Sequence, residues 1–350
     1  MNRNLDWCRS WYVFYKCLLE KRRRQEAGAL PVAKLLKLYR DGFFPNKQEM
    51  YLFARYDRSL YVSDQQILMT SHINGEQAEV LDDKVLFRLA MGRFVRVPNN
   101  FAFVHKGLLI PFDPGIKGSS DVKDLLVREK RLIAKPTRGL GGKGVNLLEY
   151  NGKDFLANGR KRSWSDLIEG LLTAGDLIIC EYVRQGEFAN LLYPHTVNTI
   201  RMLSLRDPEA KASFIAAAAF RVGCSRSLPV DNISAGGIVC GIDLDRGQLE
   251  RAATGFFGNG RFQWLEEHPD TGMRLQGLIL HGWEDICQKI RAAADNFPCL
   301  PYIAWDVALG EDDIIAIEAN SWTDVSIFQI YRPLLLDKRI AAFFAWHHIV

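Results

Sequence analysis

RLIAKPTRGLGGKGVNLLEY, residues 131–150, is the stretch of this 350-residue sequence that most restricts its fold. It predicts a strand, a glycine-rich loop and a second strand. Three of its glycines match the pattern G-x-G-x-x-G, namely Gly139, Gly141 and Gly144. A dinucleotide-binding fold needs a helix directly after such glycines, so the second strand argues against that fold. A Walker A loop is also excluded, because the sequence lacks G-x-x-x-x-G-K-[ST].

A glycine-rich loop between two paired strands is typical of a flap that folds over phosphate groups. Glycines let the backbone approach an anion closely, and the backbone N–H groups can then donate to it. Gly142 and Lys143 belong to the same loop, and Lys143 could add a positive charge. A plain hairpin turn is the alternative, but four glycines in the six residues 139–144 are more than a turn needs.

Lys135 lies in the apolar run that precedes this loop. A buried lysine destabilises a protein unless an anion accompanies it. Protein kinases also cover phosphates with a glycine-rich flap, but their lysine follows the loop, and H-R-D and D-F-G motifs accompany it. This sequence has neither motif. Lys135 is therefore predicted to bind an anion in a site of another kind.

Residues 302–320 (YIAWDVALGEDDIIAIEAN) predict an acidic β-hairpin. If its turn is symmetric about residue 312, Asp306 and Glu318 are direct cross-strand neighbours, and Ile317 lies on the opposite face of the hairpin. Opposed carboxylates destabilise a sheet unless a cation lies between them. Asn320 shares their face, and two carboxylates with an amide oxygen suit Mg²⁺. A solvated polar face is the alternative.

The segment between these two motifs supplies further polar candidates. The predicted strand 177–183 carries Glu181, and the chain that leaves it could present backbone groups to a purine ring. Arg201 and Arg221 lie in two later predicted strands. Two arginines that face one site form an anion clamp, although either alone could be an ordinary surface charge.

Residues 4–40 have apolar positions at helical spacing and predict two helices, the second over Leu30–Arg40. The basic run Lys21–Arg24 follows the first helix. One interpretation is a helix that packs on the rest of the protein beside a solvated charge run. The other is an amphipathic helix that lies peripherally on the anionic inner face of a membrane. A third helix is predicted over 82–94, with Asp82 or Asp83 as its N-cap.

Composition excludes several classes of function. The formal net charge of +4 is too small to demand a nucleic-acid partner. The seven cysteines form no C-x-x-C pair, so zinc and redox motifs are absent. No apolar run is long enough to span a bilayer, and the N-terminus lacks the pattern of a signal peptide. The mixture of strands and helices predicts an α+β enzyme in the cytoplasm, with linkers near 111–120 and 184–196.

The order of these motifs resembles the ATP-grasp superfamily of carboxylate–amine ligases. The phrases VNTIRM, FRVG and AWDVA…IEAN are similar to those of its sugar-transfer-associated members. The resemblance covers about residues 80–330 and implies an ATP-grasp fold, in which two α+β subdomains clamp ATP. The expected divisions are an N-terminal helical extension over 1–78, a small α/β subdomain over 79–130, a first ATP-grasp subdomain with the flap over 131–190, and a second with the Mg²⁺ site and a C-terminal helix over 191–350.

The resemblance also implies a role for individual residues. Those that would bind ATP are Lys84, Lys135, Gly139, Gly141, Gly142, Gly144, Glu181, Tyr182, Val183 and Glu187, the last of them through the ribose. Those that would hold Mg²⁺ are Asp306, Glu318 and Asn320. Those that would act on the reacting groups are Arg201, Arg221, Asn232 and Lys143.

The activity that this resemblance implies is ATP- and Mg²⁺-dependent ligation. A carboxylate would be activated as an acyl phosphate, with release of ADP, and joined to an amine. The carboxylate would be a small molecule or sugar-linked, in polysaccharide or sugar-conjugate biosynthesis. A kinase for a small molecule or sugar and a non-catalytic nucleotide-binding partner are the alternatives. Where many relatives carry Pro-Gly after the metal-binding asparagine, this sequence has Ser321–Asp324 (SWTD), which puts the acceptor class in question.

Overall fold

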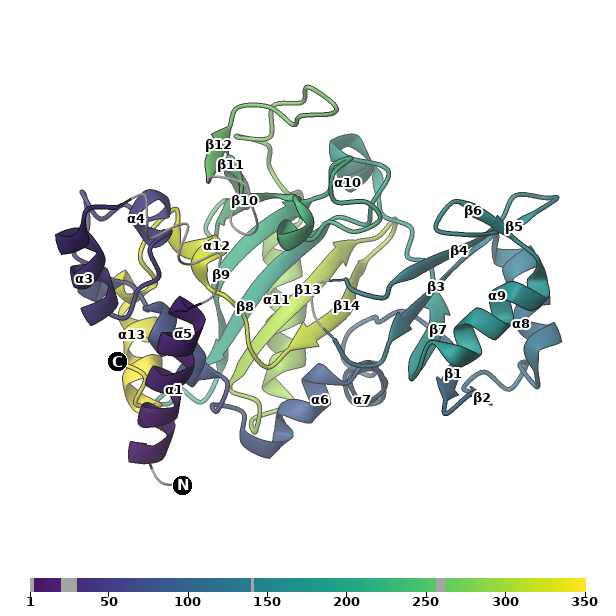
Figure 1. Cartoon of the computed structure of the whole chain (residues 1–350), viewed down its shortest axis with the longest axis horizontal. Helices are drawn as coiled ribbons and strands as arrows, with labels where there is room; N and C mark the ends of the chain where they lie inside the picture. The colour runs from purple at the N-terminus through teal and green to yellow at the C-terminus, as the bar shows by residue number, and fades with distance from the viewer. Residues whose placement is uncertain (1–2, 20–29, 140–141, 256–261) are drawn as a thin grey trace.

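Two antiparallel sheets of seven strands dominate the computed structural model, which describes residues 3–19, 30–139, 142–255 and 262–350 (Figure 1). The predicted basic run Lys21–Arg24 and the flap residue Gly141 lie outside these residues. The mixture of helices and antiparallel sheets confirms the predicted α+β class.

The first sheet has the strand order β2-β1-β7-β3-β4-β5-β6, and each strand is antiparallel to its neighbours. Its strands are β1 (Asn100–His105), β2 (Leu108–Pro111), β3 (Arg131–Pro136), β4 (Asn146–Tyr150), β5 (Phe155–Ala157), β6 (Arg160–Arg162) and β7 (Leu177–Glu181). Helices α8 (Ser119–Glu129) and α9 (Trp164–Thr173) bury their apolar sides against it. Strands β3 and β4 flank the glycine loop, as predicted.

The second sheet has the order β12-β11-β10-β9-β8-β13-β14. Its strands are β8 (Thr199–Arg206), β9 (Ser213–Val222), β10 (Ile238–Asp243), β11 (Gln248–Thr254), β12 (Gln263–Leu265), β13 (Tyr302–Leu309) and β14 (Ile314–Asn320). Every residue of β9 after Ser213 is buried. A strand that is apolar along its length needs cover on both faces of its sheet, and this sheet has such cover.

Helix α11 (Trp283–Asp295) covers one face of the second sheet, together with α6 (Glu79–Asp82) and α7 (Lys84–Met91). The other face packs against segments from both ends of the chain (Figure 1). The helices on that side are α3 (Val32–Arg40), α4 (Lys47–Met50), α5 (Asp64–Thr70), α12 (Ser326–Gln329) and α13 (Lys338–Trp346). The N-terminal extension is therefore part of the core around the second sheet.

The first helix, α1 (Arg3–Leu18), is packed on the protein along one side. Phe14 and Leu18 are buried with Phe44, whereas Tyr12 and Tyr15 are exposed. The interpretation of this segment as a helix that packs on the rest of the protein therefore holds for one side of the helix. Peripheral membrane contact stays a prediction. Among the described helices, none combines the length and the hydropathy needed to cross a bilayer.

The acidic hairpin has the predicted pairing of Asp306 with Glu318, but its turn is not symmetric about residue 312. The register shifts by one residue after this pair, so that Val307 lies opposite Ala316. Such a bulge turns the extra residue away from its expected face. For this reason, the prediction that Ile317 lies on the face opposite the acidic pair was wrong: Ile317 lines the same pocket as Asp306 and Glu318.

The two sheets are joined by residues 182–198, and the linker expected near 184–196 falls within this connection. This connection contains a short helix, α10 (Glu187–Leu192), which the sequence did not predict. The predicted linker 111–120 instead joins β2 to α8. Strand β2 belongs to the first sheet, and helix α8 packs against that same sheet. The expected division after residue 130 accordingly falls between α8 and β3, which pack against each other in the first sheet and its covering helices.

Candidate active site

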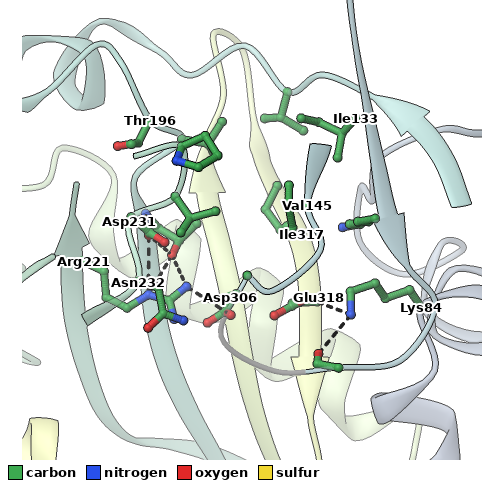
Figure 2. Close-up of a pocket in the computed structure, with 18 of the residues that line it drawn as sticks. Lys84, Ile133, Val145, Thr196, Arg221, Asp231, Asn232, Asp306, Ile317 and Glu318 are labelled. Atoms are coloured by element: carbon green, nitrogen blue, oxygen red, sulfur yellow. Dashed lines mark hydrogen bonds and ion pairs between the residues drawn. The ribbon is translucent and has the colours of Figure 1, made fainter. Parts of the chain in front are cut away.

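A cavity of about 320 Å³ lies where the flap of the first sheet meets β13 and β14 of the second. Its walls come from both sheets, from the connection around residues 195–201 and from the loops 229–233 and 322–327. Figure 2 shows the resulting arrangement, with apolar side chains at one end and charged ones across the middle. Most of the predicted site residues line this cavity.

The apolar end of the cavity consists of side chains from β3, β4, β7 and β14. Ile133, Val145 and Ile317 lie together there (Figure 2), next to Tyr182 and Val183 where β7 ends. This environment suits a flat apolar ring such as a purine. The nearby carboxylate of Glu181 accepts hydrogen bonds from Arg96 Nη2 at 3.0 Å and from the Asn99 N–H at 3.1 Å.

Lys135 enters the cavity from β3 and is only 7% exposed. Among the described residues, no carboxylate or carbonyl oxygen pairs with its ammonium group. A buried cation without a counter-ion is unfavourable in the free protein. Lys135 therefore stays a candidate for anion binding beside the flap.

The flap reaches across from the first sheet to the second. Gly142 has φ +70°, a backbone conformation that favours glycine, and a Cβ atom there would lie 3.0 Å from Val230. Gly139, Gly142 and Lys143 line the cavity. The absence of a side chain at Gly142 thus permits the close approach of the flap to the loop around residue 230.

Lys84 connects the flap with the acidic hairpin (Figure 2). Its Nζ lies 3.3 Å from Glu318 Oε2 and donates to the carbonyl oxygen of Gly139 at 3.4 Å. The side chain of Asp83 accepts hydrogen bonds from the N–H groups of Val85 and Leu86, and it therefore caps helix α7, as predicted. This cap fixes Lys84 at the first position of the helix.

Asp306 is buried beside two arginines, Arg201 of the neighbouring strand β8 and Arg221 of β9, the next strand along the sheet. Its Oδ2 accepts from Arg201 Nη2 at 3.0 Å and lies 3.1 Å from Arg221 Nη2. Burial alone would raise the pKa of Asp306, but Arg201 and Arg221 hold it below its usual value. In the sequence, a bound cation was expected to offset the opposed carboxylates; in the structure, these arginines and Lys84 already do so.

Asp231 is the main charged residue of the site that sequence reasoning missed. Its Oδ2 accepts from the N–H of Thr199 at 2.9 Å and from the hydroxyl of Thr199 at 2.6 Å, and Arg221 Nε lies 3.5 Å away. Burial raises the pKa of Asp231, although Arg221 opposes this. Burial acts to lower the pKa of Arg221, but Asp231 and Asp306 together raise it. The signal was available, since Asp231 directly precedes the predicted residue Asn232.

The candidate metal ligands are Asp306, Glu318 and Asn320, all on the cavity wall. In the part of the chain that is described, no group of three or more His, Cys, Asp or Glu side chains is arranged to hold a metal. The set is thus two carboxylates and one amide. Asn320 is 5% exposed, and its Nδ2 has no hydrogen-bond partner among the described residues. Since an amide can present either atom, an oxygen-only set that suits Mg²⁺ is available.

Two predicted nucleotide-binding residues are not brought to the cavity. Glu187 is exposed because it is the first residue of α10, the helix that was not predicted within the connection between β7 and β8. Gly144 is exposed and is not part of the cavity wall. The cavity also contains residues that were not assigned to the site from the sequence, among them His195 and Thr196, together with Trp322, Thr323 and Asp324 of the segment that departs from many relatives. They lie in loops, where no periodic sequence pattern indicates which way a side chain faces.

Replacing Gly237 with alanine is expected to lower the free energy of unfolding by about 1–3 kcal/mol. A Cβ atom there would lie 2.4 Å from the carbonyl oxygen of Asp231 and 2.9 Å from that of Asn232, so the loop that carries both residues must move. Urea denaturation would measure the change. Gly170→Ala is the matched control, because a Cβ on this residue of α9 meets nothing within 4 Å. Equal stability of the two variants would contradict the argument.

Comparison with known proteins identifies the family of this chain. A family model described as sugar-transfer associated ATP-grasp matches residues 65–343. No curated protein sequence matches the chain. Similar solved structures include the ATP-grasp ligase PsnB complexed with minimal precursor (15% identity, 77% of this chain and 62% of that chain, TM-score 0.39) and the D-alanine–D-alanine ligase from Coxiella burnetii (11%, 77% and 59%, 0.39).

Biotin carboxylase from Campylobacter jejuni is another similar structure (13% identity, 81% of this chain and 48% of that chain, TM-score 0.42). This chain therefore spans less than two thirds of the length of each of these proteins. The family match, in contrast, extends from α5 to α13 and includes every charged residue of the cavity. The chain belongs to the sugar-transfer associated ATP-grasp family and has the ATP-grasp fold.

Proposed function

We propose that this protein is an ATP- and Mg²⁺-dependent ligase that joins a carboxylate to an amine. The carboxylate oxygen takes the γ-phosphoryl group of ATP, which gives an acyl phosphate and ADP. The amine nitrogen then attacks the acyl carbon, inorganic phosphate leaves, and the amine loses a proton. The observation that supports this proposal best is the buried Lys135, whose ammonium group has no ion-pair or hydrogen-bond partner among the described residues and which lines the same cavity as Asp306 and Glu318.

The chain's own residues would contribute mainly charge and position, as in other phosphoryl transfers. When bound, ATP would supply the phosphoryl group, and Mg²⁺ on Asp306, Glu318 and Asn320 would neutralise its charge. Lys135 would bind the phosphates and the flap would exclude water. Arg201 and Arg221 would fix the Asp306 carboxylate while they supply positive potential at the reaction centre.

The test is ADP release by the full chain with ATP and Mg²⁺, against panels of uronic acids, amino acids and amines. We expect ADP and inorganic phosphate in equal amounts, dependent on both a carboxylate and an amine, and loss of both products in EDTA. A phosphorylated hydroxyl compound without free phosphate would show a kinase instead. Nucleotide binding without turnover across the panels would favour a non-catalytic partner.

We further propose a sugar-linked or other small carboxylate as substrate, in polysaccharide or sugar-conjugate biosynthesis, and a cytoplasmic setting. The family match supports the sugar connection. A uronic acid that outperforms the amino acids in the same panel would support it further, whereas activity confined to amino acids would contradict it.

A further inference from the structure

A buried lysine of the N-terminal segment lies directly behind the cavity. Lys47, in α4, is 1% exposed, and its Nζ lies 3.2 Å from Asp64 Oδ1. The same Nζ donates to the hydroxyl of Ser326 at 2.7 Å, across 279 positions of sequence. Both Lys47 and Asp64 precede residue 65, where the family match begins. This pair is thus a feature of the chain outside the matched region.

Ser326 connects Lys47 to the wall of the cavity through hydrogen bonds. Its hydroxyl donates to Asp324 Oδ1, and its N–H donates to the same oxygen at 2.8 Å. Asp324 lines the cavity together with Trp322 and Thr323. A change in the position of the Ser326 hydroxyl would therefore alter the position of a carboxylate in the cavity.

Hydrogen bonds to α5 and to α6 hold the rest of this loop. The indole Nε1 of Trp322 donates to the carbonyl oxygen of Ile67, in α5, at 2.8 Å. Ser321 donates through its N–H and its hydroxyl to the carboxylate of Asp82, at 2.8 and 2.7 Å. One residue of the loop faces the reaction centre instead: the hydroxyl of Thr323 accepts from Arg201 Nη1 at 2.8 Å.

The loop lies at the end of the cavity where the second substrate would be bound. The apolar wall around Ile133 occupies one end, and Lys84 and Glu318 lie across the middle (Figure 2). The loop follows Asn320 directly, on the side of the acidic pair away from Ile133. If the nucleotide takes the apolar end and the centre, this remaining wall is available to the acceptor.

A buried ion pair contributes little net stability, since desolvation offsets much of its attraction, but it can fix one geometry. We propose that Lys47, paired with Asp64, is a positioning residue that holds the loop Ser321–Ser326 as the acceptor-binding wall of the site. This assignment rests on the proposed function, because an acceptor is bound only if the chain transfers an activated group. The segment Phe43–Ile73 is then an integral part of the catalytic unit.

The decisive variant is Ser326→Ala, which removes the hydroxyl between Lys47 and Asp324 and leaves no charge unpaired. Lys47→Met would remove the ion-pair partner of the buried Asp64 carboxylate, and the variant could fail to fold because a buried charge would lose its counter-ion. Tyr51→Phe is the matched control. Its hydroxyl lies in the same buried cluster, 3.2 Å from Ser326 Oγ, but its loss leaves the chain of contacts from Lys47 to Asp324 intact.

Hydrogen exchange of the full-length protein tests the positioning role. In Ser326→Ala, we expect the amides of residues 321–328 to exchange about tenfold faster than in the wild type, whereas Tyr51→Phe exchanges like the wild type. Affinity for a non-hydrolysable ATP analogue with Mg²⁺ is expected to change by less than about twofold in both variants. Exchange in Ser326→Ala equal to that in Tyr51→Phe would overturn the assignment.

Kinetics separate this role from a merely structural one. We expect Ser326→Ala to raise the KM for the amine about tenfold while kcat and the KM for ATP stay within about twofold. A parallel fall in nucleotide affinity would show general damage and would overturn the assignment. If the wild type releases no ADP with any carboxylate, the proposed function fails, and the exchange experiment still decides whether the Lys47 contact holds the loop.

Discussion

Replacing Lys135 with methionine is expected to weaken nucleotide binding by about 10- to 100-fold and to remove carboxylate-dependent ADP release, because each hydrogen bond to a charged group contributes about 1.5–3 kcal/mol. The same substitution should leave the free energy of unfolding unchanged or raise it. Lys135 is buried, and no described carboxylate or carbonyl accepts from its ammonium group. Removing an uncompensated charge relieves a desolvation penalty, so affinity and stability are predicted to move in opposite directions.

Titration with an ATP analogue and thermal unfolding of the free protein together check this prediction. Lys153→Met is the matched control, because Lys153 is an exposed lysine in the turn after β4. It should change neither property. A Lys135→Met protein that is less stable than the wild type would show that Lys135 has a structural partner, and unchanged affinity would remove it from the nucleotide site.

Replacing Asp306 with asparagine is expected to lower the free energy of unfolding by about 3–5 kcal/mol and to abolish turnover. The buried carboxylate compensates Arg201 and Arg221 together, and an asparagine leaves both guanidinium groups without a shared counter-charge. The loss of activity has a second cause, since Asp306 is also one of the three candidate Mg²⁺ ligands. Urea denaturation of the free protein isolates the first effect.

Glu318→Gln is the comparison that separates metal binding from stability. Glu318 is paired with Lys84 at 3.3 Å, and its side chain is 23% exposed against 3% for Asp306, so we expect its substitution to cost less stability. We expect this variant to unfold within about 1 kcal/mol of the wild type and still to lose Mg²⁺-dependent ADP release. Turnover of Glu318→Gln at the wild-type rate would remove this residue from the metal site, and an Asp306→Asn protein of wild-type stability would refute the charge argument.

Local sequence patterns predicted the elements that place the charged centre. The run 131–150 predicted two strands around a glycine loop, and residues 302–320 predicted the pairing of Asp306 with Glu318. Alternation along a strand has a period of two, so it indicates which residues share a face until a bulge intervenes. The bulge beside Glu318 is what turned Ile317 into the cavity against that prediction.

The sequence by itself therefore determined the class of the fold, the flap and the opposed acidic pair, because each depends on contacts between residues close in the chain. Only the tertiary structure decided which cations hold Asp306, that Glu187 lies away from the cavity, and that Lys47 reaches Ser326. These features depend on how separate layers pack. A periodic pattern within one segment cannot predict that Lys47 contacts Ser326, which is 279 positions away in the sequence.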